Sequence, residues 1–319
     1  MTGTTENQRV DLRAPRFSES RWTERDDVLS ILDARGGSAE FEGLLAYLQH
    51  NNGFDFTGYR RPTLARRICR RMDLLGIQDF PTYRAYLMAH SEEFVPLLKT
   101  VLINVTSFFR DAPAWNFLAH RIVPRILDAK KDNEPIRVWS AGCASGEEVY
   151  TITMILAEVM GDETLHNRVT IFGTDVDDVA LIQARRASYT AQQLLAVPVD
   201  LRRKYFETGD GRYGFSRFRS DARPLIVFGH HDVIHDPPYA HLDLIVCRNT
   251  LMYFNTQTQK QVLARFHFAL NDDGYLFLGK AESLTNHESL FTPVNLKYRV
   301  FAKASMPRRR SSSHLEVVA

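Results

Sequence analysis

Residues 136–150 read IRVWSAGCASGEEVY, and this stretch decides the fold that we expect. Its start, IRVW, is a short apolar run typical of a buried strand. The small residues of AGCASG then allow the backbone to turn tightly and to come close to a ligand. Glu147 and Glu148 open a segment whose apolar residues can cover one face of a helix as far as Met160. A strand, a small-residue turn and a helix predict the ligand-binding corner of an open α/β sheet, where ligands lie at the carboxyl ends of the strands.

The two glutamates indicate what kind of ligand this corner holds. Phosphate-binding loops place a lysine or free backbone amides at the helix N-terminus, and the sequence contains no GxxxxGK[ST] motif. Two carboxylates repel a triphosphate but suit a ligand with hydroxyl groups and positive charge, such as S-adenosylmethionine. The alternative is that Glu147 and Glu148 only stabilise the first helical turn. The turn by itself does not decide between these two interpretations.

The composition is that of an ordinary globular protein: 319 residues, 44% hydrophobic and 24% charged, with a formal net charge of +2. This length predicts one large domain or two smaller ones. The small net charge argues against a surface built throughout for nucleic acid, and no apolar run reaches membrane-spanning length. Cys69, Cys143 and Cys247 are odd in number and far apart, which fits neither a disulfide framework nor a zinc site. We therefore expect a cytoplasmic protein without a metal and without membrane insertion.

The sequence divides into four parts. Residues 1–34 and 307–319 are polar and lack periodicity, so we expect a disordered arm and a disordered tail. Residues 35–100 have a helical pattern throughout and predict a helical N-terminal domain. Residues 101–306 are expected to form the second domain, beginning with a linker.

One helix of the N-terminal part has a strongly basic face. In RRPTLARRICRRM, residues 60–72, the apolar side chains fall on one arc of a helical wheel. The opposite arc carries Arg66, Arg67, Arg70 and Arg71. The plain interpretation is a solvated surface helix. Four arginines without an interleaved acid repel one another, however, and this favours docking on an acidic partner surface.

From residue 169 onward, strand and helix patterns alternate, which predicts a parallel sheet. Asp175 follows the second strand, 169–172, and Asp232 follows the third, 226–228. In a doubly wound sheet the first acid faces ribose hydroxyls, and the second can accept a hydrogen bond from an adenine amine. Each aspartate alone is explained by turn capping, but acids after three successive strands favour an adenosyl ligand. An insertion at about 205–222, with the turn sequence GDGRYG, predicts a small β hairpin.

Polar residues also flank the predicted sheet. Asn104, Thr106 and Arg110 belong to NVTSFFR, where they stand beside two phenylalanines that we expect in the core. Tyr253 follows the fourth strand, 242–247, on the same rim. These side chains can close a pocket over a ligand.

Two features point to other functions. Residues 236–239 spell DPPY, the tetrapeptide of amino-group methyltransferases that act on flipped adenine or cytosine. Here it precedes a strand instead of ending one, so we interpret it as a connection. His230, His231, His235 and His241 invite a metal, but no cysteine pair or HExxH helix accompanies them. We expect structural or solvent-exposed roles for these histidines.

Taken together, the motifs resemble those of the chemotaxis receptor methyltransferases of the CheR type. The resemblance runs from about residue 38 to 303 and rests on FDFTGYRRPTLARRICRRM, NVTSFFRD, VWSAGCASGEEVYT, FGTDVD, LIVCRNTLMYF and DDGYLFLGKAESL, in that order. It implies a class I methyltransferase sheet with an all-helical N-terminal domain and a small inserted antiparallel β subdomain. It also implies S-adenosylmethionine as donor, S-adenosylhomocysteine as product, and receptor glutamate carboxylates as acceptors. The expected partner is the cytoplasmic helical bundle of a receptor, and the protein is expected to act as a monomer without binding nucleic acid.

The resemblance also assigns residues to roles. Arg110 and Tyr253 match positions thought to face the transferring methyl group. The arginine face of residues 60–72 matches the surface that the family lays on the receptor, and in some members the β subdomain also binds a receptor peptide by strand addition. The cofactor pocket of the family falls on Asn104, Thr106, Arg110, Ala141, Glu147, Asp175, Asp232, Val233, Arg248 and Asn249.

The implied chemistry needs no general base, because a free glutamate has a pKa of about 4.3 and is already an anion at neutral pH. Catalysis then consists of placing the carboxylate and removing its water. Arg110 is expected to orient the carboxylate, and Tyr253 to donate a hydrogen bond or pack beside the methyl group. The competing interpretations are a donor-binding regulatory module without catalysis and a nucleic-acid amino-methyltransferase based on DPPY.

Overall fold

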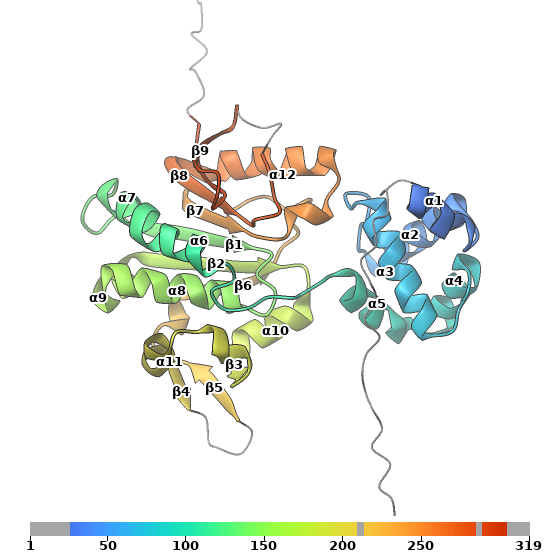
Figure 1. Ribbon diagram of the computed structural model, residues 1–319, viewed down its shortest axis with the longest axis horizontal. Helices are drawn as coiled ribbons and strands as arrows, with labels where there is room; N and C mark the ends of the chain where they lie inside the picture. Colours follow the sequence, from blue (N-terminus) through green and yellow to red (C-terminus); the bar gives the residue numbers. More distant parts are fainter. Residues whose placement is uncertain (1–25, 209–213, 285–288, 305–319) are drawn as a thin grey trace, which may run out of the picture.

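The computed structural model describes residues 26–208, 214–284 and 289–304. Figure 1 shows a helical part beside a larger part built on a sheet, connected by the segment between α5 and α6. The predicted tail at 307–319 and the first 25 residues of the predicted arm lie outside the described residues.

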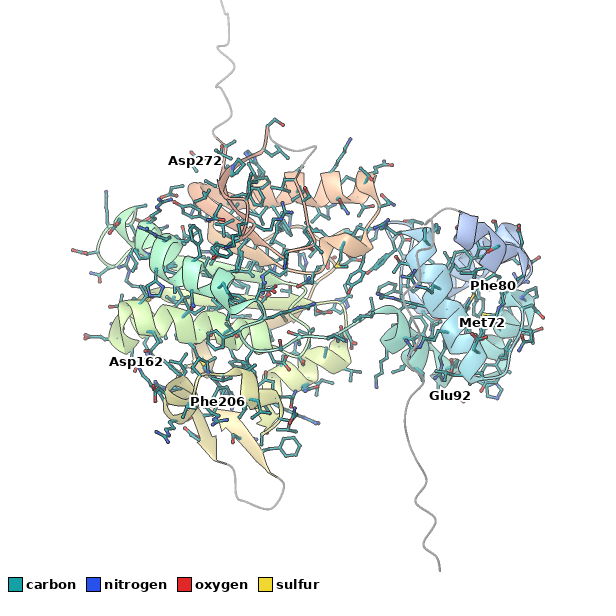
Figure 2. All side chains as sticks on the ribbon, in the orientation of Figure 1. Met72, Phe80, Glu92, Asp162, Phe206 and Asp272 are labelled. Carbon is teal, nitrogen blue, oxygen red and sulfur yellow. The ribbon has the colours of Figure 1, made fainter. Side chains whose placement is uncertain are left out.

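The N-terminal domain is all-helical, as predicted. Phe41, Leu44 and Leu48 are buried on one side of α2, where they meet Met72 and Phe80, both inside this domain in Figure 2. The domain consists of α1 (Asp26–Asp33), α2 (Ser38–Asn52), α3 (Arg61–Leu74), α4 (Phe80–Ala89), the short turn η1 (Ser91–Glu93) and α5 (Phe94–Val101).

The predicted disordered arm is wrong over its last residues. Residues 26–33 form helix α1, and Leu32 is buried in the same core as Leu44 and Met72. This segment, DDVLSILD, has only eight residues and follows a polar stretch, so it is too short to show sustained helical periodicity. Tertiary packing against α2 and α3 therefore decides its conformation.

The second domain is built on a seven-stranded sheet. Neighbouring strands are parallel from β6 to β8, and β10 is antiparallel to both of its neighbours. The spatial order is β6 (Ile226–His230), β2 (Val169–Asp175), β1 (Ile136–Ala141), β7 (Leu242–Cys247), β8 (Leu270–Leu278), β10 (Val300–Lys303) and β9 (Phe291–Asn295). The predicted parallel sheet is confirmed, and β9 is a strand that the sequence analysis missed.

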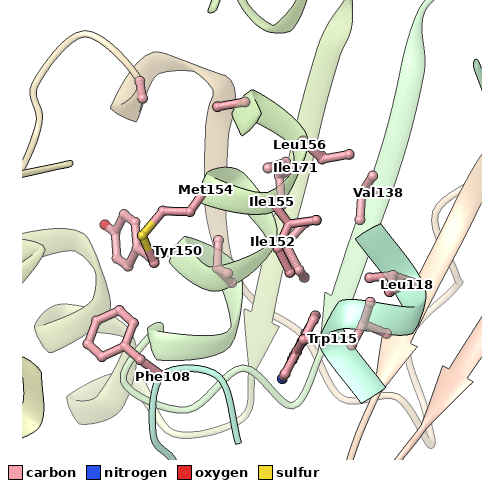
Figure 3. Close-up of a cluster of buried hydrophobic side chains, with 14 of the residues drawn as sticks. Phe108, Trp115, Leu118, Val138, Tyr150, Ile152, Met154, Ile155, Leu156 and Ile171 are labelled. Carbon is pink, nitrogen blue, oxygen red and sulfur yellow. The ribbon is translucent and has the colours of Figure 1, made fainter. Parts of the chain in front are cut away.

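Helices cover both faces of this sheet because side chains alternate along each strand. Val138 and Ile171 pack against the helices on one face, where Trp115, Leu118 and Ile152 complete the core shown in Figure 3. The next residues along β1 and β2, together with Ile245 of β7, pack on the other face against α12. The helices are α6 (Ala112–Phe117), the π-helical turn η2 (Leu118–Ile122), α7 (Val123–Asp128), α8 (Glu147–Met160), α9 (Asp162–Arg168), α10 (Asp178–Arg186), α11 (Val199–Tyr205) and α12 (Thr256–Ala269).

The predicted hairpin insertion is part of a three-stranded antiparallel sheet. Its order is β3 (Ser188–Thr190), β5 (Phe215–Phe218) and β4 (Phe206–Thr208). The sequence analysis missed β3, because three residues are too few to show alternation. The small sheet lies at the bottom of Figure 1, away from the helical domain.

Two further findings concern both domains. No helix in the described ranges is long and apolar enough to cross a membrane. Cys69, Cys143 and Cys247 are buried free thiols.

Candidate active site between the two domains

A cavity lies between the helical domain and the carboxyl ends of the parallel strands. It encloses about 1120 Å³, including its open mouth, and residues of both domains line it. From the helical side, α3 contributes Thr63, Leu64 and Arg67. Most of the predicted site residues line the cavity too: Asn104, Thr106, Arg110, Asp175, Asp232, Val233, Arg248, Asn249 and Tyr253.

Asp175 ends β2 inside this cavity. Its Oδ2 accepts a hydrogen bond from the Ala144 amide at 2.8 Å, and its Oδ1 accepts one from the Asp177 amide at 3.0 Å. Burial raises the pKa of Asp175, while the backbone hydrogen bonds lower it. Ala144 has φ 46°, a strained value for a residue with a side chain. The turn after β1 is thus bent so that its amide meets the carboxylate of the neighbouring strand.

Glu148 lines the cavity, whereas Glu147, the glutamate that the resemblance assigns to the cofactor, is not among the lining residues. The Glu147 carboxylate accepts hydrogen bonds from Ser145 Oγ at 2.7 Å and Gln193 Nε2 at 3.3 Å, toward the small sheet. Glu148 Oε1 accepts a hydrogen bond from Ser140 Oγ at 2.8 Å. Consecutive residues of a helix point about 100° apart, so the two carboxylates have different surroundings. The resemblance assigned Glu147 to the cofactor pocket, whereas Glu148 is the one that lines the cavity.

Burial dominates the electrostatics of Glu148. It raises the pKa of Glu148 to about 7, against the lowering effects of the Arg248 charge and the Ser140 hydrogen bond. Ala141, the other predicted residue outside the cavity, has its side chain in the core on the α12 face. Its neighbours Gly142 and Ala144 supply the cavity wall instead.

Asp232 follows β6, as predicted, and its side chain is tied locally. Oδ1 accepts from the Ile234 amide at 2.7 Å, and Oδ2 lies 2.9 Å from His235 Nδ1. His231 also lines the cavity and is 7% exposed. The sequence analysis grouped His231 with the other histidines, although its position beside Asp232 at a strand end was a signal.

The DPPY tetrapeptide belongs to the connection between β6 and β7 and is not part of the cavity wall. Its Tyr239 ring stacks on Phe172 with centroids 4.5 Å apart, and the Pro237 carbonyl lies 3.0 Å from His231 Nε2. The contacts of Pro237 and Tyr239 thus give this segment a structural role. In residues 26–208, 214–284 and 289–304, no group of three or more His, Cys, Asp or Glu side chains is arranged to hold a metal ion.

The linker crosses the cavity mouth in a strained conformation. Asn104 Nδ2 donates to Asp177 Oδ2 at 2.6 Å and ties the linker to the loop after β2. Arg110 is exposed at the mouth, and its Nη1 donates to the Val105 carbonyl at 3.0 Å. The residues on either side, Phe109 and Asp111, have φ of 49° and 63°. Such strain persists only where the surroundings impose it, and it concentrates at functional sites.

Arg248 and Asn249, which follow β7, form the far wall. Arg248 is 6% exposed and donates to the Arg110 carbonyl at 2.9 Å and to Asp111 Oδ2 at 2.7 Å. Asn249 has φ 61°, and Glu282 accepts its amide at 3.0 Å together with the next two amides. Arg248 Nε and Asn249 Oδ1 are buried without a hydrogen-bond partner in the described part of the chain. A ligand in the cavity can satisfy both atoms.

The four arginines of α3 have different surroundings. Arg66 and Arg70 are exposed. Arg71 forms a bidentate pair with the buried Glu93, with N–O distances of 2.7 and 2.6 Å. Arg67 donates to the Val101 carbonyl and lies with its guanidinium 4.9 Å from the centre of the Tyr253 ring. The structure therefore does not bring all four to one free basic face, because Glu93, distant in sequence, holds Arg71.

Gly142 provides the first prediction. Its φ is 79°, and a Cβ atom there would collide with the adjacent Thr250 side chain, which also lines the cavity. We expect Gly142→Ala to destabilise the fold by about 1–2 kcal/mol from backbone strain and to weaken ligand binding by displacing Thr250. Thermal unfolding and donor titration measure the two effects.

Gly53→Ala is the matched control. Gly53 also has a positive φ, 72°, and nothing lies within 4 Å of the position that an added Cβ atom would take, so this variant has the positive-φ strain without the collision. Equal loss of donor affinity in both variants would contradict a specific role of the Gly142–Thr250 contact.

The comparisons with known proteins agree with this geometry. The family model "CheR methyltransferase, all-alpha domain" matches residues 39–102, and "CheR methyltransferase, SAM binding domain" matches residues 104–300. The chemotaxis protein methyltransferase of Escherichia coli is 31% identical over 263 residues, 80% of this chain and 87% of that protein. The chemotaxis protein methyltransferase of Borreliella burgdorferi is 27% identical over 258 residues, 79% of this chain and 90% of that protein.

A longer relative is also similar. An uncharacterized 104.1 kDa protein of Rhodobacter capsulatus is 32% identical over 303 residues, which is 91% of this chain but only 31% of that protein. The two family models meet at the linker that borders the cavity and together cover both domains. The resemblance predicted from the motifs is confirmed, and the chain belongs to the CheR methyltransferase family.

Proposed function

We propose that this protein transfers a methyl group from S-adenosylmethionine to glutamate side-chain carboxylates on the helical bundle of a chemotaxis-type receptor. The observation that carries the proposal is the cavity between the domains, which has acids at the strand ends and cations at its mouth. The names of the Escherichia coli and Borreliella burgdorferi relatives support it.

The residues that are present fit the donor. Its ribose hydroxyls and its positive charge suit the carboxylates of Asp175 and Glu148. Asp232 and the unpartnered Asn249 Oδ1 are hydrogen-bond acceptors, while the unpartnered Arg248 Nε is a donor for a carboxylate. When bound, S-adenosylmethionine supplies an electrophilic methyl group on a sulfonium.

The chain itself has to bring an ionised carboxylate to this site and remove its water. The acceptor needs no base, since a glutamate with a pKa of about 4.3 is already an anion near neutral pH. Arg110 is exposed at the cavity mouth, and among the described residues its side chain donates one hydrogen bond, from Nη1 to the Val105 carbonyl. The remaining N–H groups of the guanidinium can receive a carboxylate. Tyr253 lies on the same wall and can pack beside the acceptor or donate a hydrogen bond to it.

Docking of the receptor is assigned to the exposed cations of α3. Arg66 and Arg70 are one helical turn apart and exposed, so both can meet an acidic surface. Arg71 is neutralised by Glu93, so we do not assign it to docking.

The test is transfer of a radiolabelled methyl group from the donor to receptor-containing membranes. We expect alkali-labile label on a membrane protein, as methyl esters hydrolyse in alkali, and no label on a receptor whose acceptor glutamates are changed to glutamine. Alkali-stable label on nucleic acid would contradict the proposal. Donor binding without any transfer would instead favour a regulatory module.

A further inference from the structure

We propose that Arg67 is a positioning residue of the active site, which holds the Tyr253 ring in place, and is not a docking residue for the receptor. The inference rests on the proposed methyl transfer and concerns one of the arginines that the sequence assigns to partner binding. Two observations support it: the side of α3 on which Arg67 lies, and the contacts that its side chain makes there.

Arg67 and Arg70 belong to the same helix but point to different surroundings. Arg67 is half-buried and lines the cavity, whereas Arg66 and Arg70 are exposed. On the helix, residues 66 and 70 form one row, and residues 67 and 71 form another about 100° away. The second row is turned toward the rest of the protein. Arg71 forms an ion pair with Glu93, and Arg67 contacts the Tyr253 ring of the other domain.

Two contacts fix Arg67. Its Nη1 donates to the carbonyl of Val101, the last residue of α5, and its guanidinium lies 4.9 Å from the centre of the Tyr253 ring. A cation over an aromatic face is attracted by the ring quadrupole, and the attraction grows when water is excluded. Arg67 thus joins the end of the helical domain to the aromatic side chain on the cavity wall.

The backbone around Tyr253 is held from the same domain. The Tyr253 carbonyl accepts from the Arg60 amide at 2.9 Å, and the Asn255 amide donates to the Gly58 carbonyl at 2.9 Å. The rings of Tyr59 and Phe254 meet edge to face with centroids 5.2 Å apart. These contacts fix the main chain at residues 253–255, and the Tyr253 ring itself packs against the core on the α12 face. Arg67 adds a cationic contact to the ring, and it does so from the helix whose exposed face is proposed to meet the receptor.

Kinetics can separate positioning from docking. We expect Arg67→Ala to lower kcat about tenfold, while the KM for receptor membranes and its salt dependence stay within about twofold of wild type. Arg70→Ala, the matched control one turn away, is expected to raise KM and to weaken its salt dependence. Arg67→Lys keeps a cation that can meet the ring but loses the planar guanidinium that also reaches the Val101 carbonyl, so its kcat should lie between those of Arg67→Ala and wild type.

A double-mutant cycle identifies the partner. In a Tyr253→Ala background, Arg67→Ala should cause little further loss of kcat, because its ring contact is already gone. In a Tyr253→Phe background, which keeps the ring, the loss should remain. Donor affinity, measured by calorimetry, reports whether each variant is folded.

The inference is overturned if Arg67→Ala and Arg67→Lys raise KM in the manner of Arg70→Ala and leave kcat unchanged. It is also overturned if the losses at Arg67 and Tyr253 simply add. Failure of the proposed function itself looks different, since the wild-type protein would then label no receptor at all.

Discussion

Replacing Glu148 by glutamine is expected to weaken donor binding about 10- to 100-fold at pH 8, the size of effect typical of a lost charge-assisted hydrogen bond. Glu148 is buried in the cavity wall, where it accepts a hydrogen bond from Ser140 and lies within the electrostatic reach of Arg248 and Arg110. Isothermal titration with the donor and with its demethylated product measures the loss. The product lacks the sulfonium charge. If Glu148 interacts with that charge, Glu148→Gln should weaken binding of the product less than binding of the donor.

The pH dependence follows from the raised pKa. Because burial raises the pKa of Glu148 to about 7, the side chain is protonated below that pH and cannot pair with a cation. Wild-type donor affinity should therefore increase as the pH rises through about 7, and in Glu148→Gln this increase should disappear. Glu147→Gln is the matched control, since that adjacent carboxylate is also buried but points toward Gln193. If Glu147→Gln loses the donor and Glu148→Gln keeps it, our placement of the two acids is wrong.

Glu148→Gln should also stabilise the ligand-free protein at alkaline pH. A carboxyl group whose folded pKa is raised contributes stability that is full below the unfolded pKa, about 4.5, and is lost as the pH rises through about 7. At pH 8, Glu148→Gln removes this cost, which is on the order of 3 kcal/mol at most. Burial also raises the pKa of Glu147, Asp175 and Glu282. Only the difference between variant and wild type, in chemical denaturation at pH 5 and pH 8, therefore isolates Glu148.

The sequence predicted the sheet domain well because its signals are local and repeated. The limits of β7 agree with the predicted strand 242–247, and Asp175 and Asp232 lie at the strand ends where parallel topology places them. Short or weakly patterned elements were missed instead. Strand β3 has three residues, and α1 depends on packing against other helices.

Side-chain direction at the site could not be predicted in the same way. The sequence shows two glutamates after the turn, but the choice between them depends on the rotation of α8 against β1, which is set by packing on both helix faces. The arginines of α3 show the same limit. Arg71 pairs with Glu93, which is 22 residues away in sequence. Arg67 contacts the ring of Tyr253 in the other domain. Long-range contacts of this kind leave no trace in helical periodicity.

Arg110→Ala is expected to lower kcat about a hundredfold while donor affinity stays within about threefold. The backbone of Arg110 is fixed by its carbonyl, which accepts from Arg248 at 2.9 Å and from Trp115 Nε1 at 2.8 Å. Its side chain is therefore anchored at one end and open to the mouth at the other, with strained residues on both sides. This arrangement suits a group that receives a carboxylate from solvent and aligns it, and a small misalignment of reacting atoms is enough to cause such a loss. The Arg110 charge also lowers the pKa of Glu148, so the kinetics belong at about pH 8.5, where Glu148 stays ionised in either protein.

Three companion variants sharpen this prediction. Arg110→Lys retains the charge but not the two-pronged geometry, and we expect an intermediate kcat. Tyr253→Phe keeps the ring under Arg67 and should cost less than about fivefold, since packing remains and one hydrogen bond is lost. The Asp111→Asn substitution weakens the ion pair with Arg248 and tests whether the strained loop, rather than the guanidinium, carries the effect. Full turnover in Arg110→Ala with unchanged donor affinity would contradict a role of Arg110 in the reaction. A large loss of kcat in Asp111→Asn with none in Arg110→Ala would instead show that the strained loop, and not the guanidinium, is responsible.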